Sequence, residues 1–395
     1  MKKSESSLVP PPLRSLRPSV QILAFAFLTS CLTCPAAPLP EFSNWPTYHG
    51  DSGLRGISPT PIKPPLSVGW RFKVGAPISQ PPIVFNGVIY ALSDRGEAIA
   101  LSMEGVKRWS STLPQIPQQE LFSTPPVYVN NCLLAGTDRG VIYAFEAATG
   151  ALRWNIKIGE DIYGAINWLE PEGTNGFSAL AISRSSGSLF RLELSTGRVI
   201  WASKPEGRSD GSPAAGNNLI VFGACDSALH FIAPLTGATV AKINFADHGP
   251  MAGGTAMAGT RAYGGTRDGS VFCADTTTFK PLWIHQIASN EVFTTPALTT
   301  DRVLVGSADE FLYCLNRADG KIIWASRTQD SPTSPVVAGN TVVVTAGGTL
   351  SLLSLADGKT LWSDKPCDSL SAPALSAGKI IVGTDDGFII LYQSK

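Results

Sequence analysis

A short pattern that recurs along the chain constrains the fold more than any other feature of the sequence. In its clearest copy, Val141–Trp154, an alternating strand ends at Thr149-Gly150, and a second strand reaches Trp154 four residues after the glycine. Glycine supplies the positive φ that a tight turn between two strands requires. We interpret the tryptophans as structural anchors of the repeat. They stand at Trp70, Trp109, Trp154, Trp201, Trp283, Trp324 and Trp362, and Ala241 takes the place of one.

The spacing of the anchors indicates the architecture. Successive anchors are 38 to 47 residues apart, which leaves room for about four short strands and is typical of one β-propeller blade. The strand Val68–Val74 lacks the three strands that should precede it, whereas residues 372–392 supply three strands and no tryptophan. Joining the two ends in one blade removes two open sheet edges. We therefore predict an all-β, eight-bladed β-propeller of four-stranded repeats over residues 66–395, whose last blade is closed by the N-terminal strand.

Two repeats depart from the pattern. The third contains an insertion, Trp168–Phe177, which is interpreted either as a solvated loop or as a projection that binds a partner. The fourth carries Ala241, and the fifth has Phe279 where the other turns have glycine. We expect looser packing around Ala241, with a cavity or a substitute side chain beside it.

The N-terminal segment resembles an export signal. Residues 1–30 carry a net charge of +3, and the apolar run Ile22–Leu28 that follows the basic residues is too short to span a bilayer. Leu28-Thr29-Ser30-Cys31 resembles a bacterial lipobox, in which Cys31 would be lipidated; cleavage near Ala36-Ala37 is the alternative and would release a soluble, secreted protein. We predict an export signal over residues 1–37, membrane contact through a lipid anchor only, and an extended Pro-rich strap over residues 38–65.

Composition and motifs argue against several classes of function. The formal net charge is zero, so there is no basic surplus to indicate a nucleic-acid partner. The five cysteines after the N-terminal segment lie in different repeats without a CxxC pair, and the four histidines have no metal-binding spacing. The chain contains neither a GxSxG nor a phosphate-loop motif. We expect no metal site and no catalytic residue.

One set of carboxylates recurs at a fixed offset. Four of these carboxylates stand five residues before the proline that opens the first strand of their repeat. Asp161 is included as the counterpart in the third repeat. The set is Glu120, Asp161, Glu291, Asp330 and Asp368. On a ring, these positions would form an acidic mouth of the central channel that attracts a cationic peptide, partner or ion. The alternative is that they are solvated loop carboxylates without a role.

These repeats resemble the PQQ-like β-propeller repeat, with its small-residue strand, Thr-Gly turn and tryptophan, from about Trp45 to the C-terminus. Two groups with different functions share this repeat. Outer-membrane assembly factors of the BamB type are exported lipoproteins without catalysis, whereas quinoprotein alcohol dehydrogenases bind PQQ and calcium on the propeller axis. The dehydrogenases are longer than this chain and carry adjacent cysteines, which this chain lacks.

The resemblance therefore favours a non-catalytic scaffold for protein–protein interaction, with no cofactor. It implies a periplasmic or outer-membrane lipoprotein whose partner is the outer-membrane β-barrel assembly machinery. Two alternatives stay open. One is a PQQ-dependent quinoprotein dehydrogenase, which would use PQQ and calcium, and the other is an extracellular module that binds polysaccharide or peptide.

Overall fold

The computed structural model describes residues 44–112, 120–171, 176–204, 207–251 and 253–395. The predicted export signal of residues 1–37, with Cys31, and residues 38–43 of the predicted strap lie outside the described residues. No helix among the described residues is both long and apolar enough to cross a membrane.

The described residues form eight sheets, seven of them four-stranded. In every sheet the strands are antiparallel neighbours, except for one parallel strand, β1 (Ile57–Ser58), that joins the seventh blade. Blade 1 consists of β3 (Ile83–Phe85), β4 (Val88–Leu92), β5 (Glu97–Ser102) and β6 (Lys107–Thr112), and blade 2 of β7 (Val127–Val129), β8 (Cys132–Gly136), β9 (Val141–Glu146) and β10 (Leu152–Lys157). Blade 3 consists of β11 (Asn167–Leu169), β12 (Ser178–Ile182), β13 (Leu189–Glu193) and β14 (Val199–Ala202), and blade 4 of β15 (Ala214–Gly216), β16 (Leu219–Ala224), β17 (Ala228–Ile232) and β18 (Thr239–Asn244). Blade 5 consists of β19 (Ala256–Ala258), β20 (Arg261–Gly265), β21 (Ser270–Asp275) and β22 (Lys280–Gln286), and blade 6 of β23 (Ala297–Leu298), β24 (Arg302–Gly306), β25 (Phe311–Asn316) and β26 (Ile322–Arg327). Blade 7 consists of β27 (Val336–Ala338), β28 (Thr341–Ala346), β29 (Thr349–Ser354) and β30 (Thr360–Asp364), and blade 8 of β31 (Ala374–Ser376), β32 (Lys379–Gly383), β33 (Phe388–Ser394) and β2 (Leu66–Lys73). A short 3-10 helix, η1 (Ala246–His248), follows β18.

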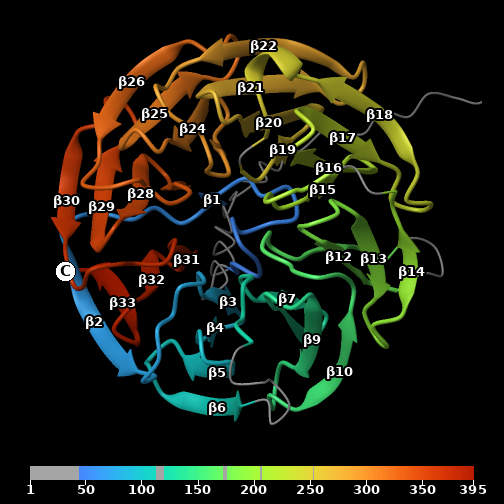
Figure 1. The fold of residues 1–395 in the computed structure, drawn as a ribbon. Helices are drawn as coiled ribbons and strands as arrows, with labels where there is room; N and C mark the ends of the chain where they lie inside the picture. The colour runs from blue at the N-terminus through green and yellow to red at the C-terminus, as the bar shows by residue number, and fades with distance from the viewer. Residues whose placement is uncertain (1–43, 113–119, 172–175, 205–206, 252) are drawn as a thin grey trace, which may run out of the picture. The chain divides into compact units, whose positions relative to one another are not determined.

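The blades follow one another around a ring, with the short first strands inside and the anchor strands outside (Figure 1). The N-terminal β2 pairs antiparallel with β33 and supplies the outer strand of blade 8, with Val68 opposite Tyr392 and Phe72 opposite Ile389. The prediction of an eight-bladed propeller closed by the N-terminal strand is confirmed. The middle strands are buried on both faces, as in β8 and β28, because each blade packs between two neighbours.

The glycine and the tryptophan of the repeat meet across the joint between two blades. The Trp154 indole Nε1 donates to the Leu194 carbonyl of the next blade at 2.9 Å. A Cβ atom on Gly197 would lie only 2.5 Å from Cε3 of Trp154, so only glycine lets the turn lie against the indole face. Six of the seven indoles pack on a turn in this way, namely Trp70, Trp109, Trp154, Trp201, Trp283 and Trp324. Trp283 and Trp324 are buried, and the other five are half-buried at the rim.

The two departures from the repeat pattern complement each other at the joint between blades 4 and 5. Ala241 of β18 lies opposite Phe231, and the ring of Phe279 packs edge-on against Phe231 at 5.1 Å between centroids. Phe279 stands where a glycine would receive the missing indole. The expected substitute side chain is therefore Phe279, which comes from the opposite side of the joint.

Strand direction divides the ring into two faces. The second–third turns and the connections between blades lie at one end of the sheets, called here the connection face. The first–second and third–fourth turns lie at the other end, called the turn face. Asn44, the first described residue, accepts a hydrogen bond from the backbone of Asn86 in the first–second turn of blade 1. The described chain therefore enters the ring from the turn face.

The strap of residues 44–62 plugs the channel and is not extended throughout, because it turns at residues 47–50 and 51–54. Its carbonyl groups accept hydrogen bonds from the second residue of the inner strand in six blades: Val84, Tyr128, Ala215, Met257, Leu298 and Val337. In blade 3 the side-chain amide of Asn167 links the inner strand to the strap. Its Oδ1 accepts a hydrogen bond from the Trp168 backbone N–H, and its Nδ2 donates one to the Ser52 carbonyl. An inner strand exposes unpaired backbone groups toward the axis, and the strap pairs them.

Candidate functional site at the mouth of the central channel

A hollow of about 210 Å³ opens on the connection face, above the plug. The Tyr48 ring of the strap belongs to its lining, and its hydroxyl is held by Thr295 and Ser334. Blades 1 to 6 contribute the other walls. The lining includes Gln80, Pro81, Pro125, Tyr163, Gly164, Asp210, Ser212, Gly253, Gly254, Phe293 and Thr295.

A collar of glycines brings the backbones of neighbouring blades together at this mouth. A Cβ atom on Gly164 would lie 2.2 Å from the Gly211 carbonyl oxygen, and one on Gly211 would lie 2.4 Å from the Gly253 carbonyl oxygen. A Cβ atom on Gly253 would lie 2.1 Å from the Phe293 carbonyl oxygen. Any larger residue would push adjacent blades apart. This part of the mouth is therefore closely packed and lined by backbone.

Asp210 is the centre of a charge network that spans blades 3 to 5. It lies in the connection before blade 4, and its carboxylate pairs with Arg184 from the β12–β13 turn. Arg208 lies 3.1 Å away on the same connection, and Arg267 approaches at 3.3 Å from the β20–β21 turn. Burial by itself raises the pKa of Asp210, but hydrogen bonds from Arg184 and Arg208 outweigh it, so the pKa lies below its usual value. The carboxylate is therefore ionised at neutral pH.

Two of the predicted carboxylates extend this network to either side. Asp161 lies 3.4 Å from Arg184, and Glu291 lies 2.9 Å from Arg267. The mouth from blade 3 to blade 6 thus alternates carboxylates with arginines. The guanidinium groups of Arg208 and Arg267 are more exposed than the carboxylate of Asp210.

The other three predicted carboxylates are placed differently. Glu120 is buried and accepts a hydrogen bond from the Thr137 hydroxyl at 2.7 Å, so it holds the β8–β9 turn. Asp330 and Asp368 are exposed on the connections before blades 7 and 8, and no ion pair to either is found within the described residues. The five positions therefore do not form one uniform acidic ring.

Sequence reasoning missed the arginines and Asp210. Arg208 stands five residues before Pro213, the same offset that singled out the carboxylates. A search for any charged residue at that offset would have found it. Arg184 and Arg267 occupy second–third turns and carry no comparable signal, because their approach to the mouth depends on blade geometry.

Two exposed apolar side chains lie on neighbouring connections of this face, and one of them contacts the network. Tyr163 is 45% exposed and Leu121 is 44% exposed, each on a connection between blades. The Arg184 guanidinium carbon lies 4.2 Å from the centroid of the Tyr163 ring, within the range of a cation–π contact. The mouth thus combines apolar contact area with charges of both signs.

The axis offers little for a metal-dependent cofactor. Among the described residues no group of three or more His, Cys, Asp or Glu side chains could hold a metal ion. Asp210, the carboxylate that lines the hollow, already pairs with three guanidinium groups. The residues present at the mouth therefore do not fit a calcium-bound group on the propeller axis.

Known proteins with similar sequences fall into two groups. An outer membrane protein assembly factor BamB from Burkholderia pseudomallei is 27% identical over 371 residues, covering 82% of this chain and 92% of the relative. A tetrathionate hydrolase from Acidithiobacillus ferrooxidans is 23% identical over 300 residues, covering 68% of this chain and 52% of the relative.

Solved structures share the fold at low identity. BamB from Moraxella catarrhalis superposes with a TM-score of 0.70 and 19% identity, covering 84% of this chain and 98% of that one. The quinohemoprotein alcohol dehydrogenase from Comamonas testosteroni gives a TM-score of 0.74 and 13% identity, covering 89% and 81%. These likenesses concern the propeller alone.

The sequence profile described as outer membrane protein assembly factor BamB matches four overlapping stretches, residues 67–161, 104–248, 226–369 and 295–394. Together these stretches contain all eight blades apart from the first residue of β2. The chain therefore belongs to the BamB family of PQQ-like propeller proteins.

Proposed function

We propose that this protein is an exported, non-catalytic scaffold of outer-membrane protein assembly that binds a protein partner at the mouth on its connection face. Family membership supports the process. The single observation that carries the binding face is the exposed Tyr163 stacked with Arg184 beside the network around Asp210. Tyrosine and arginine contribute most to the energy of many protein interfaces.

The charges at the mouth suit a partner with charges of both signs. Arg208 and Arg267 present their guanidinium groups outward, whereas Asp330 and Asp368 extend the rim with carboxylates. Such alternation fixes orientation and excludes wrong partners more than it adds affinity. Leu121 supplies a second apolar contact on the neighbouring connection.

Membrane attachment is a second part of the proposal. We infer that the protein is attached to the outer membrane through lipidated Cys31, as the resemblance of residues 28–31 to a lipobox indicates. The described chain begins on the turn face at Asn44, the face opposite the proposed docking mouth. A Cys31→Ser variant that stays in the membrane fraction would contradict this anchor.

The test of partner binding is the recovery of the outer-membrane assembly machinery from detergent-solubilised membranes. Tyr163→Ser should reduce recovery at least tenfold, while the thermal midpoint stays within about 2 °C because the side chain is half exposed. Leu235→Ser is the matched control, since Leu235 is 48% exposed on the turn face. Equal recovery with both variants would refute docking at the mouth.

A second candidate function is a PQQ-dependent oxidoreductase, which the likeness to the quinohemoprotein dehydrogenase favours. We infer instead that no cofactor is bound, because Asp210 is committed to arginines and the strap fills the axis. Purified protein mixed with PQQ and calcium should show no saturable absorbance change and no alcohol-dependent dye reduction. Stoichiometric uptake of PQQ would establish the enzyme instead.

A further inference from the structure

The hollow at the channel mouth is lined, in blades 1 to 6, by the residue two positions before each inner strand. In blades 3 and 6 the backbone N–H of this residue donates to a hydroxyl group of the next blade. The Ala165 N–H donates to Ser212 Oγ at 2.8 Å, and the Thr295 N–H donates to Ser334 Oγ at 2.9 Å. In blades 1 and 2 the residue is Pro81 or Pro125, which has no N–H to satisfy.

Blades 4 and 5 leave their N–H groups at this position without an acceptor. By the geometry of blade 3, the Ser212 N–H faces Gly254 of the next blade, which has no hydroxyl group. The Gly254 N–H faces Thr295, whose hydroxyl lies 3.2 Å from the Tyr48 hydroxyl. Neither N–H finds an acceptor among the described residues. Both residues are buried in the wall of the hollow, where an unpaired donor costs free energy.

The rest of the lining restricts which acceptor can enter. Among the described residues of this wall, Asp210 is the charged one, and its ionised carboxylate disfavours a second anion in the hollow. Pro81, Pro125 and Phe293 provide apolar surface. A neutral amide suits this wall, because its carbonyl oxygen can accept from the open N–H groups and its own N–H can donate to Asp210.

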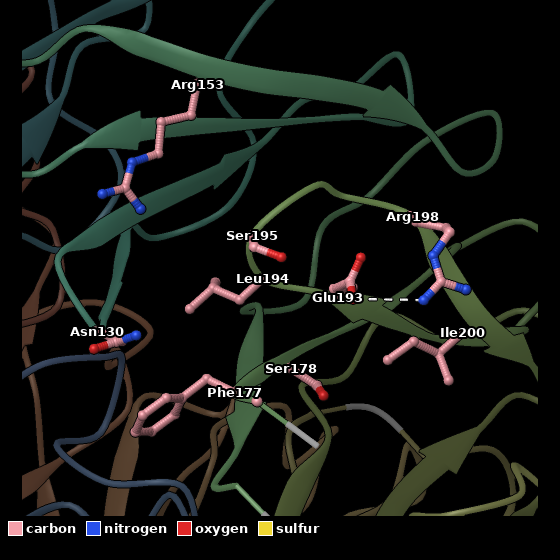
Figure 2. A pocket seen from close by; sticks show the side chains of 10 residues that line it. Asn130, Arg153, Phe177, Ser178, Glu193, Leu194, Ser195, Arg198 and Ile200 are labelled. Atoms are coloured by element: carbon pink, nitrogen blue, oxygen red, sulfur yellow. Dashed lines mark hydrogen bonds and ion pairs between the residues drawn. The ribbon is translucent and has the colours of Figure 1, made fainter. Parts of the chain in front are cut away.

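A larger pocket between blades 2 and 3 shows the contrast. It has a volume of about 370 Å³ and lies on the turn face. Figure 2 shows Arg198 beside Glu193 on one of its sides and Arg153 on the other. Arg198 pairs with Glu193 at 3.4 Å, and Arg153 pairs with Glu146. The charges of this pocket are therefore balanced, and no open donor in a buried wall selects a ligand there.

We propose that the hollow at the mouth binds a neutral peptide amide of the docked partner. A loop of the partner places a backbone or side-chain carbonyl on the N–H groups of Ser212 and Gly254 and an apolar group on Pro81 and Pro125. Backbone donors that bind a peptide in this way recur in peptide recognition. This inference rests on docking at the mouth and adds the chemistry of the segment that enters it.

NMR spectroscopy of the ¹⁵N-labelled protein tests the hollow without the assembly machinery. The probe is N-acetyl-leucine N-methylamide, which is neutral and carries two carbonyl groups and an apolar side chain. N-acetyl-leucinate is its anionic counterpart. We expect saturable shifts of the Ser212 and Gly254 amide signals with the neutral probe, and at least fivefold weaker binding of the anion. No saturable shift at these two signals, or an anion that binds as tightly, would overturn the proposal.

Variants at position 212 isolate the backbone donor. Ser212→Pro removes the N–H and creates the Pro-Pro pair with which blades 1 and 2 enter their inner strands. Ser212→Ala is the matched variant, because it also loses the hydroxyl but keeps the N–H. Relative to Ser212→Ala, Ser212→Pro should bind the neutral probe at least threefold more weakly and recover at least threefold less assembly machinery from membranes. Ala372→Pro creates the same pair in blade 8, outside the hollow, and should behave as the original chain does.

Two results with these variants would overturn the proposal. One is equal binding of the probe by Ser212→Pro and Ser212→Ala. The other is equal recovery of the machinery by both variants, because the partner would then not use the donor. Docking at the mouth is judged separately by Tyr163→Ser, so its failure is distinguishable from a failure at Ser212.

Discussion

A buried histidine in the channel plug should make the stability of the ring depend on pH. His49 is only 2% exposed. Its Nδ1 lies 3.1 Å from the Leu54 carbonyl oxygen, so Nδ1 carries the proton. The other ring nitrogen, Nε2, is buried without a hydrogen-bond partner in the described part of the chain. Protonating Nε2 would place a charge inside the plug, where burial disfavours it.

The size of the effect follows from the pKa. Burial lowers the pKa of His49 from 6.5 to about 4. Above pH 6.5 the imidazole is neutral in both the folded and the unfolded chain, so the full stability is present. Below pH 6.5 the unfolded chain takes up a proton that the folded chain refuses until about pH 4. At about 1.4 kcal/mol per pH unit, the free energy of unfolding should fall by about 3 kcal/mol across this window.

Urea unfolding at a series of pH values between 7.5 and 4 measures this loss against a His49→Asn variant. Asparagine tolerates the positive φ of 58° at this position and keeps a donor for Leu54, but does not titrate. The variant should therefore lose about 3 kcal/mol less than the original chain between pH 6.5 and 4. If His49→Asn and the original chain have parallel pH profiles, the reasoning about the plug is wrong.

Three further predictions concern the ring. Gly197→Ala should cost about 2–4 kcal/mol of unfolding free energy, measured by urea unfolding, because its Cβ would meet Trp154 and its φ is +75°; an unchanged midpoint would contradict the joint. Ala241→Trp and Phe279→Gly should each destabilise alone but compensate when combined, giving a coupling of about 1–3 kcal/mol in a double-mutant cycle; additive effects would argue against complementarity. Deleting residues 38–74 should abolish hydrogen-exchange protection in β31–β33, because the plug and β2 are lost together; native protection there would refute closure by the N-terminal strand.

The fold could be predicted from the sequence because glycine and tryptophan recur at the same positions in most repeats. Counting strands at both ends was sufficient to predict closure. The pattern could not reveal that the Trp154 indole packs on Gly197 of the next blade, because each of these repeats has its own glycine and its own tryptophan. For the same reason, the sequence did not show that the missing tryptophan at Ala241 and the missing glycine at Phe279 belong to one joint.

The plug and the mouth were beyond sequence reasoning for a different physical reason. Residues 44–62 have no strand periodicity, and their partners are backbone groups of inner strands that become neighbours only when the ring closes. The carboxylates at Asp161 and Glu291 were identified by their offset, but their charges are balanced by Arg184 and Arg267 from turns distant in sequence. The offset therefore predicted which face of the ring carries these carboxylates, but it could not predict that arginines balance their charge.

Site-specific photo-crosslinking in intact cells tests the central claim most directly. A photoreactive amino acid replaces Tyr163 in one strain and Leu235 in another, since both side chains are exposed, on opposite faces of the ring. The account predicts that position 163 crosslinks to a component of the outer-membrane β-barrel assembly machinery and that position 235 does not. A crosslink to that machinery from position 235 alone, or none from position 163, would contradict it.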